Sequence, residues 1–66
     1  MKIVLNGEPH ATASARDIAA LIAELALPAP ALLVEHNGLA LRRAEWPQRP
    51  LADGDRVEIV RIVAGG

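Results

Sequence analysis

The sequence predicts an α+β fold in which a small mixed β-sheet packs against a single helix. Three features lead to this prediction. Two short apolar runs are each closed by an Asn-Gly pair, which favours the two-residue turn of a β-hairpin. One stretch repeats apolar residues at helical spacing, and the last third contains a β-branched run typical of a strand. The predicted order is therefore β-β-α-β-β-β.

Composition limits what this chain can be. Its 66 residues suffice for one domain, predicted to span residues 1–66, and Trp46 is the only aromatic residue, so the core must consist of Leu, Ile and Val. The net charge of −1 argues against nucleic-acid binding, which depends on a basic surface. No apolar run approaches the ~20 residues of a membrane span. The absence of cysteine suits a cytoplasmic protein, and we expect a monomer.

The first half is predicted to form a hairpin and the helix. Ile3-Val4-Leu5 and a return strand around 9–13 flank Asn6-Gly7, and Pro9 indicates that the return strand lies at a sheet edge. The helix is expected over 14–26, with either Ser14 or Asp17 as its N-cap and prolines beyond its end. Its apolar stripe comprises Ile18, Leu21, Ile22 and Leu25.

The second half is predicted to complete the sheet. A strand over 31–36, the Asn37-Gly38 turn and a short strand over 39–41 form a second hairpin. Residues 42–51 are expected to be irregular with a helical turn. The Asp53-Gly54-Asp55 turn then leads into a final strand over 56–63, which we expect beside the first strand.

The final strand also predicts a contact surface. Alternation places Val57, Ile59, Arg61 and Val63 on one face and Arg56, Glu58, Val60 and Ile62 on the other. The second face begins charged and becomes apolar near its end. We expect Val4 on the same side, so that Val4, Val60 and Ile62, with Arg61 nearby and Val63 beyond, form a patch for partner enzymes.

The ending Ala64-Gly65-Gly66 is the strongest candidate for a working group. Glycine has no Cβ, so such an end can enter a slot too narrow for other residues. We expect this tail to be flexible and to present the Gly66 carboxylate to a partner.

Other candidate sites have plainer interpretations. Two acidic residues around Gly54 indicate a structural turn rather than metal ligands. His10 and His36 lie in separate segments without a third ligand at a recognisable spacing, so we expect surface histidines and no metal site. Trp46 could be a binding anchor, but packing over the small core explains it at least as well.

These features together resemble the ubiquitin-like β-grasp fold and, more specifically, the ThiS family of sulfur carrier proteins in thiamine biosynthesis. The resemblance covers the whole chain and is densest after Leu41, apart from Arg42, where family members often have proline. The residues that carry it are Arg43, Trp46, Leu51, Asp53-Gly54-Asp55, Val57-Glu58-Ile59-Val60 and Ala64-Gly65-Gly66.

The resemblance implies a definite chemistry at Gly66. A ubiquitin-activating-type adenylyltransferase (ThiF-like) uses ATP to adenylate the terminal carboxylate. Sulfur from a donor enzyme, acting through the adenylyltransferase, then replaces AMP, and the resulting thiocarboxylate gives its sulfur to thiazole synthase (ThiG-like). The chain itself would bind no cofactor and would be a regenerated cosubstrate rather than an enzyme.

Three alternatives remain at this point. The small subunit of molybdopterin synthase shares the fold, the Gly-Gly ending and the chemistry but is typically longer. A ubiquitin-like modifier would instead form isopeptide bonds with lysines. A plain interaction domain would not need Gly65-Gly66 at all.

Overall fold

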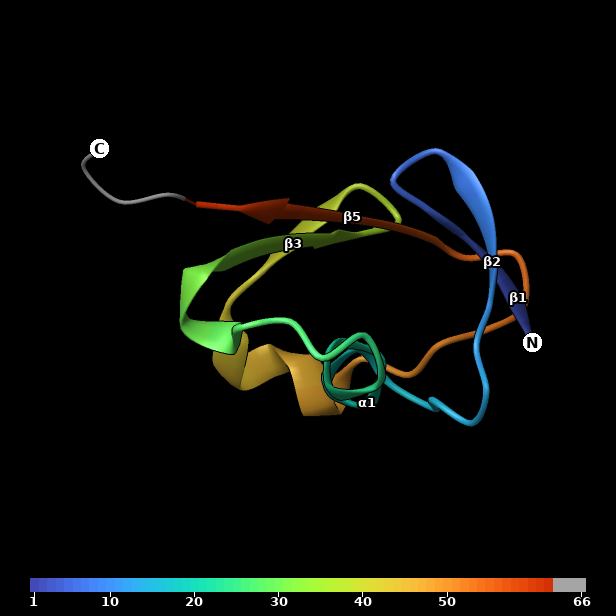
Figure 1. Ribbon diagram of the computed structural model, residues 1–66, viewed down its shortest axis with the longest axis horizontal. Coiled ribbons are helices and arrows are strands. Elements are labelled where there is room, and N and C mark those ends of the chain that lie inside the picture. Colours follow the sequence, from blue (N-terminus) through green and yellow to red (C-terminus); the bar gives the residue numbers. More distant parts are fainter. Residues whose placement is uncertain (63–66) are drawn as a thin grey trace.

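The last strand in the sequence is the middle strand of the sheet. The computed structural model describes residues 1–62, and its five strands form one mixed sheet in the order β2-β1-β5-β3-β4 (Figure 1). The strands are β1 (Lys2–Leu5), β2 (Glu8–Ala11), β3 (Leu32–His36), β4 (Leu39–Leu41) and β5 (Arg56–Arg61). β1 and β5 are parallel, and all other neighbouring strands are antiparallel. The predicted element order along the chain, β-β-α-β-β-β, and the pairing of the first strand with the last are confirmed.

Both Asn-Gly pairs form the predicted tight turns. Asn6 and Gly7 have φ angles of 49° and 82°, and Asn37 and Gly38 have φ angles of 50° and 85°. Two consecutive residues with positive φ define a type I′ turn, whose twist matches that of the flanking strands.

The second strand lies at the edge of the sheet, as predicted, but it spans 8–11 rather than 9–13. The two-residue turn brings Glu8 directly opposite Leu5, so pairing begins one residue earlier than expected. Pro9 pairs with Val4 in this edge strand, where a missing N–H is tolerated.

The helix α1 (Ile18–Glu24) is shorter than the predicted 14–26. Asp17 is its N-cap, because the carboxylate accepts a hydrogen bond of 2.8 Å from the backbone N–H of Ala20. Residues 13 and 14 stay outside the helix, because the Glu24 carboxylate accepts hydrogen bonds from the N–H groups of Ala13 and Ser14. The helix ends before the prolines, where Ala26 adopts a φ of 56°.

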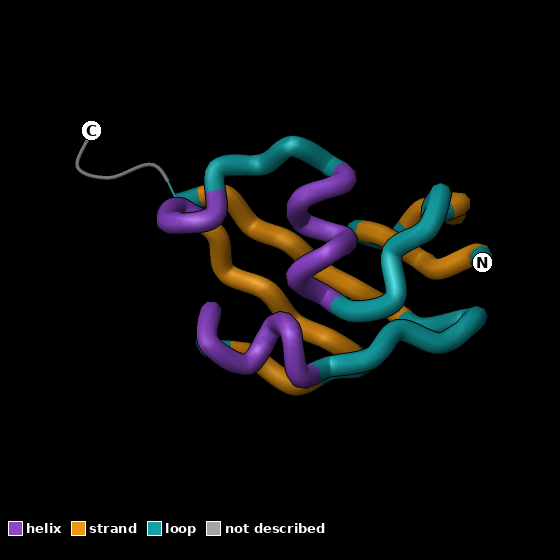
Figure 2. The backbone as a smooth tube through the Cα atoms, turned by 90° about the horizontal axis from the view of Figure 1, so that it is seen from below, coloured by secondary structure: helices purple, strands orange, loops and turns teal. Residues whose placement is uncertain are grey.

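Two short 3₁₀ helices complete the fold, η1 (Ala29–Ala31) and η2 (Arg43–Gln48). The second is the helical turn predicted within 42–51. Figure 2 shows that α1 and η2 lie side by side over one face of the sheet.

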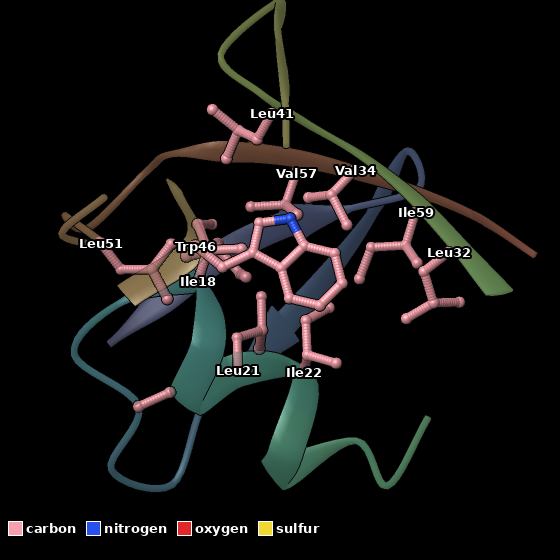
Figure 3. Close-up of a cluster of buried hydrophobic side chains, with 12 residues drawn as sticks. Ile18, Leu21, Ile22, Leu32, Val34, Leu41, Trp46, Leu51, Val57 and Ile59 are labelled. Carbon is pink, nitrogen blue, oxygen red and sulfur yellow. The ribbon is translucent and has the colours of Figure 1, made fainter. Parts of the chain in front are cut away.

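The core fills the space between this helical layer and the sheet. Ile18, Leu21 and Val57 are completely buried, and Trp46 lies among them with 4% of its surface exposed (Figure 3). The interpretation of Trp46 as a packing residue is confirmed. The remaining core members are Ile3, Ala15, Ile22, Leu32, Val34, Leu41, Leu51 and Ile59.

Replacing Leu21 with Ala should lower the free energy of unfolding by about 2–5 kcal/mol, because it leaves a cavity beneath the sheet. Alanine has a helix propensity at least as high as that of leucine, so the loss of stability reports packing alone. Leu39→Ala is the control, since Leu39 is half exposed and should change stability by less than about 0.5 kcal/mol. Urea unfolding of both variants measures the difference, and equal losses would contradict this description of the core.

Candidate functional site

The candidate site is the end of β5 and the sheet surface around it. Figure 1 shows β5 running toward the end of the molecule that lies opposite the N-terminus. The predicted working residue Gly66 lies outside the described residues, as do Val63, Ala64 and Gly65. Their predicted roles therefore stay predictions.

The two faces of β5 differ as its alternation predicts. Val57 and Ile59 are buried against the helical layer, whereas Val60 is 56% exposed and Ile62 is 48% exposed. The sheet face away from the helices therefore carries exposed apolar side chains just before the end of β5. Exposed apolar side chains that adjoin one another are typical of a protein contact surface.

The membership of this patch differs from the prediction. Val4 is half-buried and pairs with Arg56, four residues before Val60, a separation of about 13 Å along the strand. The prediction that Val4 adjoins Val60 is therefore wrong. The direct partner of Val60 is instead Leu33, which is 57% exposed. We call Leu33, Val60 and Ile62 the outer patch.

Arg61 lies on the other side of the strand. It follows the alternation of Val57 and Ile59, so it projects toward the helical side and lines a groove there with Leu27. Arg61 therefore adjoins the outer patch in sequence but faces away from it.

The outer patch gives way to charged residues further back along the sheet. Glu35 of β3 pairs directly with Glu58 of β5, and both side chains are exposed. Together with Asn37 and Arg56 they line a shallow hollow of about 320 Å³. Two carboxylates directly opposite each other repel, so this part of the face favours a cationic group on whatever contacts it.

A polar cluster holds the start of β5 in position. His36 is buried, with 3% of its surface exposed, so the expectation of a surface histidine is wrong here. Its Nε2 lies 2.7 Å from Asp55 Oδ2, and Arg49 donates to its Nδ1 over 3.2–3.3 Å. Because an arginine only donates, Nδ1 must be the acceptor, which assigns the ring proton to Nε2. His36 thereby links the segment after η2 to the turn that starts β5.

Asp55, the last residue of the predicted Asp53-Gly54-Asp55 turn, is the centre of this polar cluster. Partial burial alone would raise the pKa of Asp55, but hydrogen bonds from His36, the Ala52 N–H and Asn37 together lower it below its ordinary value. Gly54 has a φ of 87°, which suits glycine in the turn. The interpretation of Asp53-Gly54-Asp55 as a structural turn is confirmed.

The described part of the chain offers little else with the character of a site. Within residues 1–62, no three His, Cys, Asp or Glu side chains are grouped as ligands for a metal ion. None of the helices described is long and apolar enough to cross a membrane. The other histidine, His10, is half-buried, with its Nε2 4.0 Å from a carboxylate oxygen of Glu24.

Comparison with known proteins gives one consistent result. The model of the ThiS family matches residues 3–66. The sulfur carrier protein ThiS of Thermus thermophilus is 36% identical over 62 residues, which cover 94% of this chain and 95% of that protein. Two thiazole synthases match the whole chain, at 33% identity in Paramagnetospirillum magneticum and 32% in Magnetococcus marinus. The chain spans about a fifth of the length of these two enzymes (20% of each).

The solved structures agree with the sequence matches. The crystal structure of the thiamine biosynthesis protein ThiS from Geobacter metallireducens superposes with a TM-score of 0.84 at 30% identity, covering all of both chains. The solution structure of a thiamine biosynthesis protein from the same organism gives 0.82 at 30% identity and covers all of this chain and 88% of the other. The arrangement of five strands and one helix matches these structures.

The Asp55 carboxylate should stabilise the fold most above its ordinary pKa of 3.8. Because folding lowers this pKa, the contribution is present above pH 3.8 and is lost as the pH falls through the lower folded value. Asp55→Asn should cost about 1–3 kcal/mol at pH 7, and less at acidic pH. Urea unfolding between pH 7 and pH 2 measures both proteins. A difference that stays constant over this range would contradict the assignment.

Proposed function

The chain belongs to the ThiS family of sulfur carrier proteins in thiamine biosynthesis, and on that premise we propose that the Gly66 carboxylate is the group that carries the sulfur. The observation that supports this most directly is that the family match continues through residue 66 and so includes the Gly-Gly pair. Residues 1–62 serve as the folded handle that presents this end.

The proposed chemistry starts from the low reactivity of a carboxylate. A free terminal carboxyl group has a pKa of about 3.3–3.7, so it is ionised at neutral pH and resists nucleophiles. Adenylation joins it to the α-phosphate of ATP and releases pyrophosphate, which creates an acyl group with AMP as the leaving group. A sulfur nucleophile from a persulfide then forms the carbon–sulfur bond as the bond to AMP breaks. The product of this step is an acyl disulfide with the donor. A second thiol then attacks the donor sulfur of that disulfide, which releases the C-terminal thiocarboxylate and leaves a disulfide on the donor that a cellular reductant must restore.

The proposed partners supply what this chemistry needs besides the carboxylate. An adenylyltransferase of the ubiquitin-activating type would supply the ATP site. A sulfur-donor enzyme would act through that adenylyltransferase. The chain would then be a cosubstrate that is consumed and regenerated, with no cofactor of its own, in the cytoplasm where ATP is available.

Thiazole synthase is the proposed acceptor of the sulfur. Two proteins with this name contain a stretch that matches the whole chain, so in them a domain of this type is joined to the remainder of the polypeptide. A carrier and its acceptor must meet in every cycle, and joining them raises their effective concentration. We propose that this chain docks on a thiazole synthase to deliver the sulfur.

The outer patch is the proposed docking surface for both enzymes. It includes Ile62, the last described residue, so an enzyme that covers it would also reach the residues that follow in the chain. The charged hollow behind it, with Glu35 and Glu58, would orient a basic group of the partner.

Intact mass tests the proposed working group. After incubation with the adenylyltransferase, ATP and the sulfur donor, the chain should gain about 16 Da, the same increase as oxidation of Met1. A thiocarboxylate-specific alkylating reagent separates the two. A chain without Gly66 is the control and should not be alkylated. Alkylation that persists without Gly66, or conjugates of higher mass in place of a free thiocarboxylate, would overturn the proposal.

The docking surface has its own test. Val60→Asp should weaken binding to the adenylyltransferase and to thiazole synthase by about tenfold or more, because a charge would be buried against an apolar surface. Stability should change by less than about 0.5 kcal/mol, since Val60 is exposed.

Leu39→Asp is the matched control for Val60→Asp. Leu39 is also half exposed, but its pairing with the buried His36 places it on the opposite face of the sheet. It should bind both enzymes like the unchanged protein. Wild-type rates of adenylation and thiazole formation with Val60→Asp would refute the assignment of the outer patch.

A further inference from the structure

Among residues 1–62, one edge of β5 has no neighbouring strand along its second half. β1 pairs with β5 at Val4↔Arg56 and Leu5↔Val57 and then turns away at Asn6. On the other side, β3 pairs with β5 as far as Arg61. The sheet is therefore complete on the β3 side and open on the β1 side from Ile59 onward.

The ladder with β3 shows which residues face the open edge. The N–H of Asn37 donates to the carbonyl of Arg56, and the N–H of Ile62 donates to the carbonyl of Ala31. In an antiparallel pair, alternate residues direct their backbone groups to opposite sides. Arg56 and Ile62 therefore face β3. Ile59 is three residues from each of them, an odd number, so its N–H and C=O point toward the β1 side, and those of Arg61 do the same.

The structure uses a side chain to cover part of this edge. The N–H of Ile59 donates to the side-chain oxygen of Asn6 over 2.7 Å, which extends the ladder one step beyond the backbone of β1. Within residues 1–62, β1 offers no partner to the carbonyl of Ile59 or the N–H of Arg61, because its pairing with β5 stops at Leu5 and Val57. The carbonyl of Ile59 and the N–H of Arg61 thus remain available to pair with the backbone of an added strand.

An apolar groove opens at the same place. It has a volume of about 240 Å³ and lies between the end of α1 and β5, with Leu5, Leu25, Leu27 and Ile59 among its lining residues. These leucines are only partly buried, unlike Leu21 of the core. A longer β1 would both complete the ladder and cover this groove. The hydrogen bonding and the apolar packing are therefore incomplete at the same position.

We propose that an extended segment of a partner protein binds here as an added strand beside β5. Its backbone would pair with Ile59 and Arg61, and an apolar side chain would enter the groove. Arg61 also lines the groove and makes no ion pair within residues 1–62. The segment should therefore carry a carboxylate two residues from the apolar side chain, because residues two apart lie on the same face of a strand.

This charge also argues against a second copy of the chain as the occupant. Pairing two copies along the same edge would bring two Arg61 side chains together, and like charges across a strand pair are unfavourable. The site lies on the helical side of β5, whereas the outer patch lies on the other, so the proposal goes beyond the docking surface described above and does not depend on it.

The test uses the full-length chain made by chemical synthesis, with and without a methyl group on the backbone nitrogen of Arg61. This methyl group removes the donor that faces the open edge and leaves the side chain intact. The control carries the same methyl group on Ala40. The N–H of Asn37 faces β5, so Glu35, two residues away, also directs its backbone groups toward β5 and not toward its partner Ala40. The N–H of Ala40 therefore faces the outer edge of β4, the last strand of the sheet.

The probe is the peptide acetyl-Thr-Leu-Thr-Glu-Thr-amide, followed by NMR chemical shifts of the chain. We expect saturable shifts at Arg61 and Asn6, at least about tenfold weaker binding with N-methyl Arg61 and unchanged binding with N-methyl Ala40. Arg61→Glu should reverse the preference in favour of a peptide with Lys in place of Glu.

Three results would overturn the proposal. The first is the absence of saturable shifts up to about 10 mM peptide, and the second is equal binding by both methylated chains. The third is a set of shifts at Arg61 that depends on chain concentration alone, which would assign the edge to a second copy. None of these results bears on whether Gly66 carries sulfur.

Discussion

The pairing of β5 on both of its edges is the constraint on which the rest of this structure depends. The last strand lies between β1, to which it is parallel, and β3, to which it is antiparallel. A parallel pair of strands requires a crossover, and here the crossover carries α1, the β3–β4 hairpin and η2. These helices cover one face of the sheet, which buries Val57 and Ile59 and leaves Val60 and Ile62 exposed.

Polar side chains stabilise β5 where the short strands around it end. Asp55 and His36 fix its start, and Asn6 provides the last hydrogen bond on the β1 side. Within residues 1–62, only β3 pairs with it beyond that point, so the end of the strand is paired along one edge alone. This combination suits the proposed role, in which the terminus must be presented by a firm support and still be accessible to more than one enzyme. The outer patch and the open edge lie on either side of the same strand end.

Much of this architecture could be predicted from local patterns. The Asn-Gly pairs define the turns, and the stripe from Ile18 to Leu25 defines the helical face. The pairing register could not be predicted, and for that reason Leu33 was missed and Val4 was placed in the patch. The sequence likewise gives no sign that His36 meets Asp55, since the two lie nineteen positions apart. The helix start was ambiguous because Ser14 and Asp17 are equally good caps, and only the tertiary contact of Glu24 with residues 13–14 decides between them.

The central claim is that this chain carries sulfur on Gly66 and hands it to thiazole synthase. The most direct measurement is a single turnover in which the chain, loaded with isotopically labelled sulfur as its thiocarboxylate, is mixed with thiazole synthase and its other substrates. The account predicts that one labelled sulfur per chain appears in the thiazole and that the chain returns to the carboxylate form. Thiazole that forms without the label, while the label stays on the chain, would contradict it.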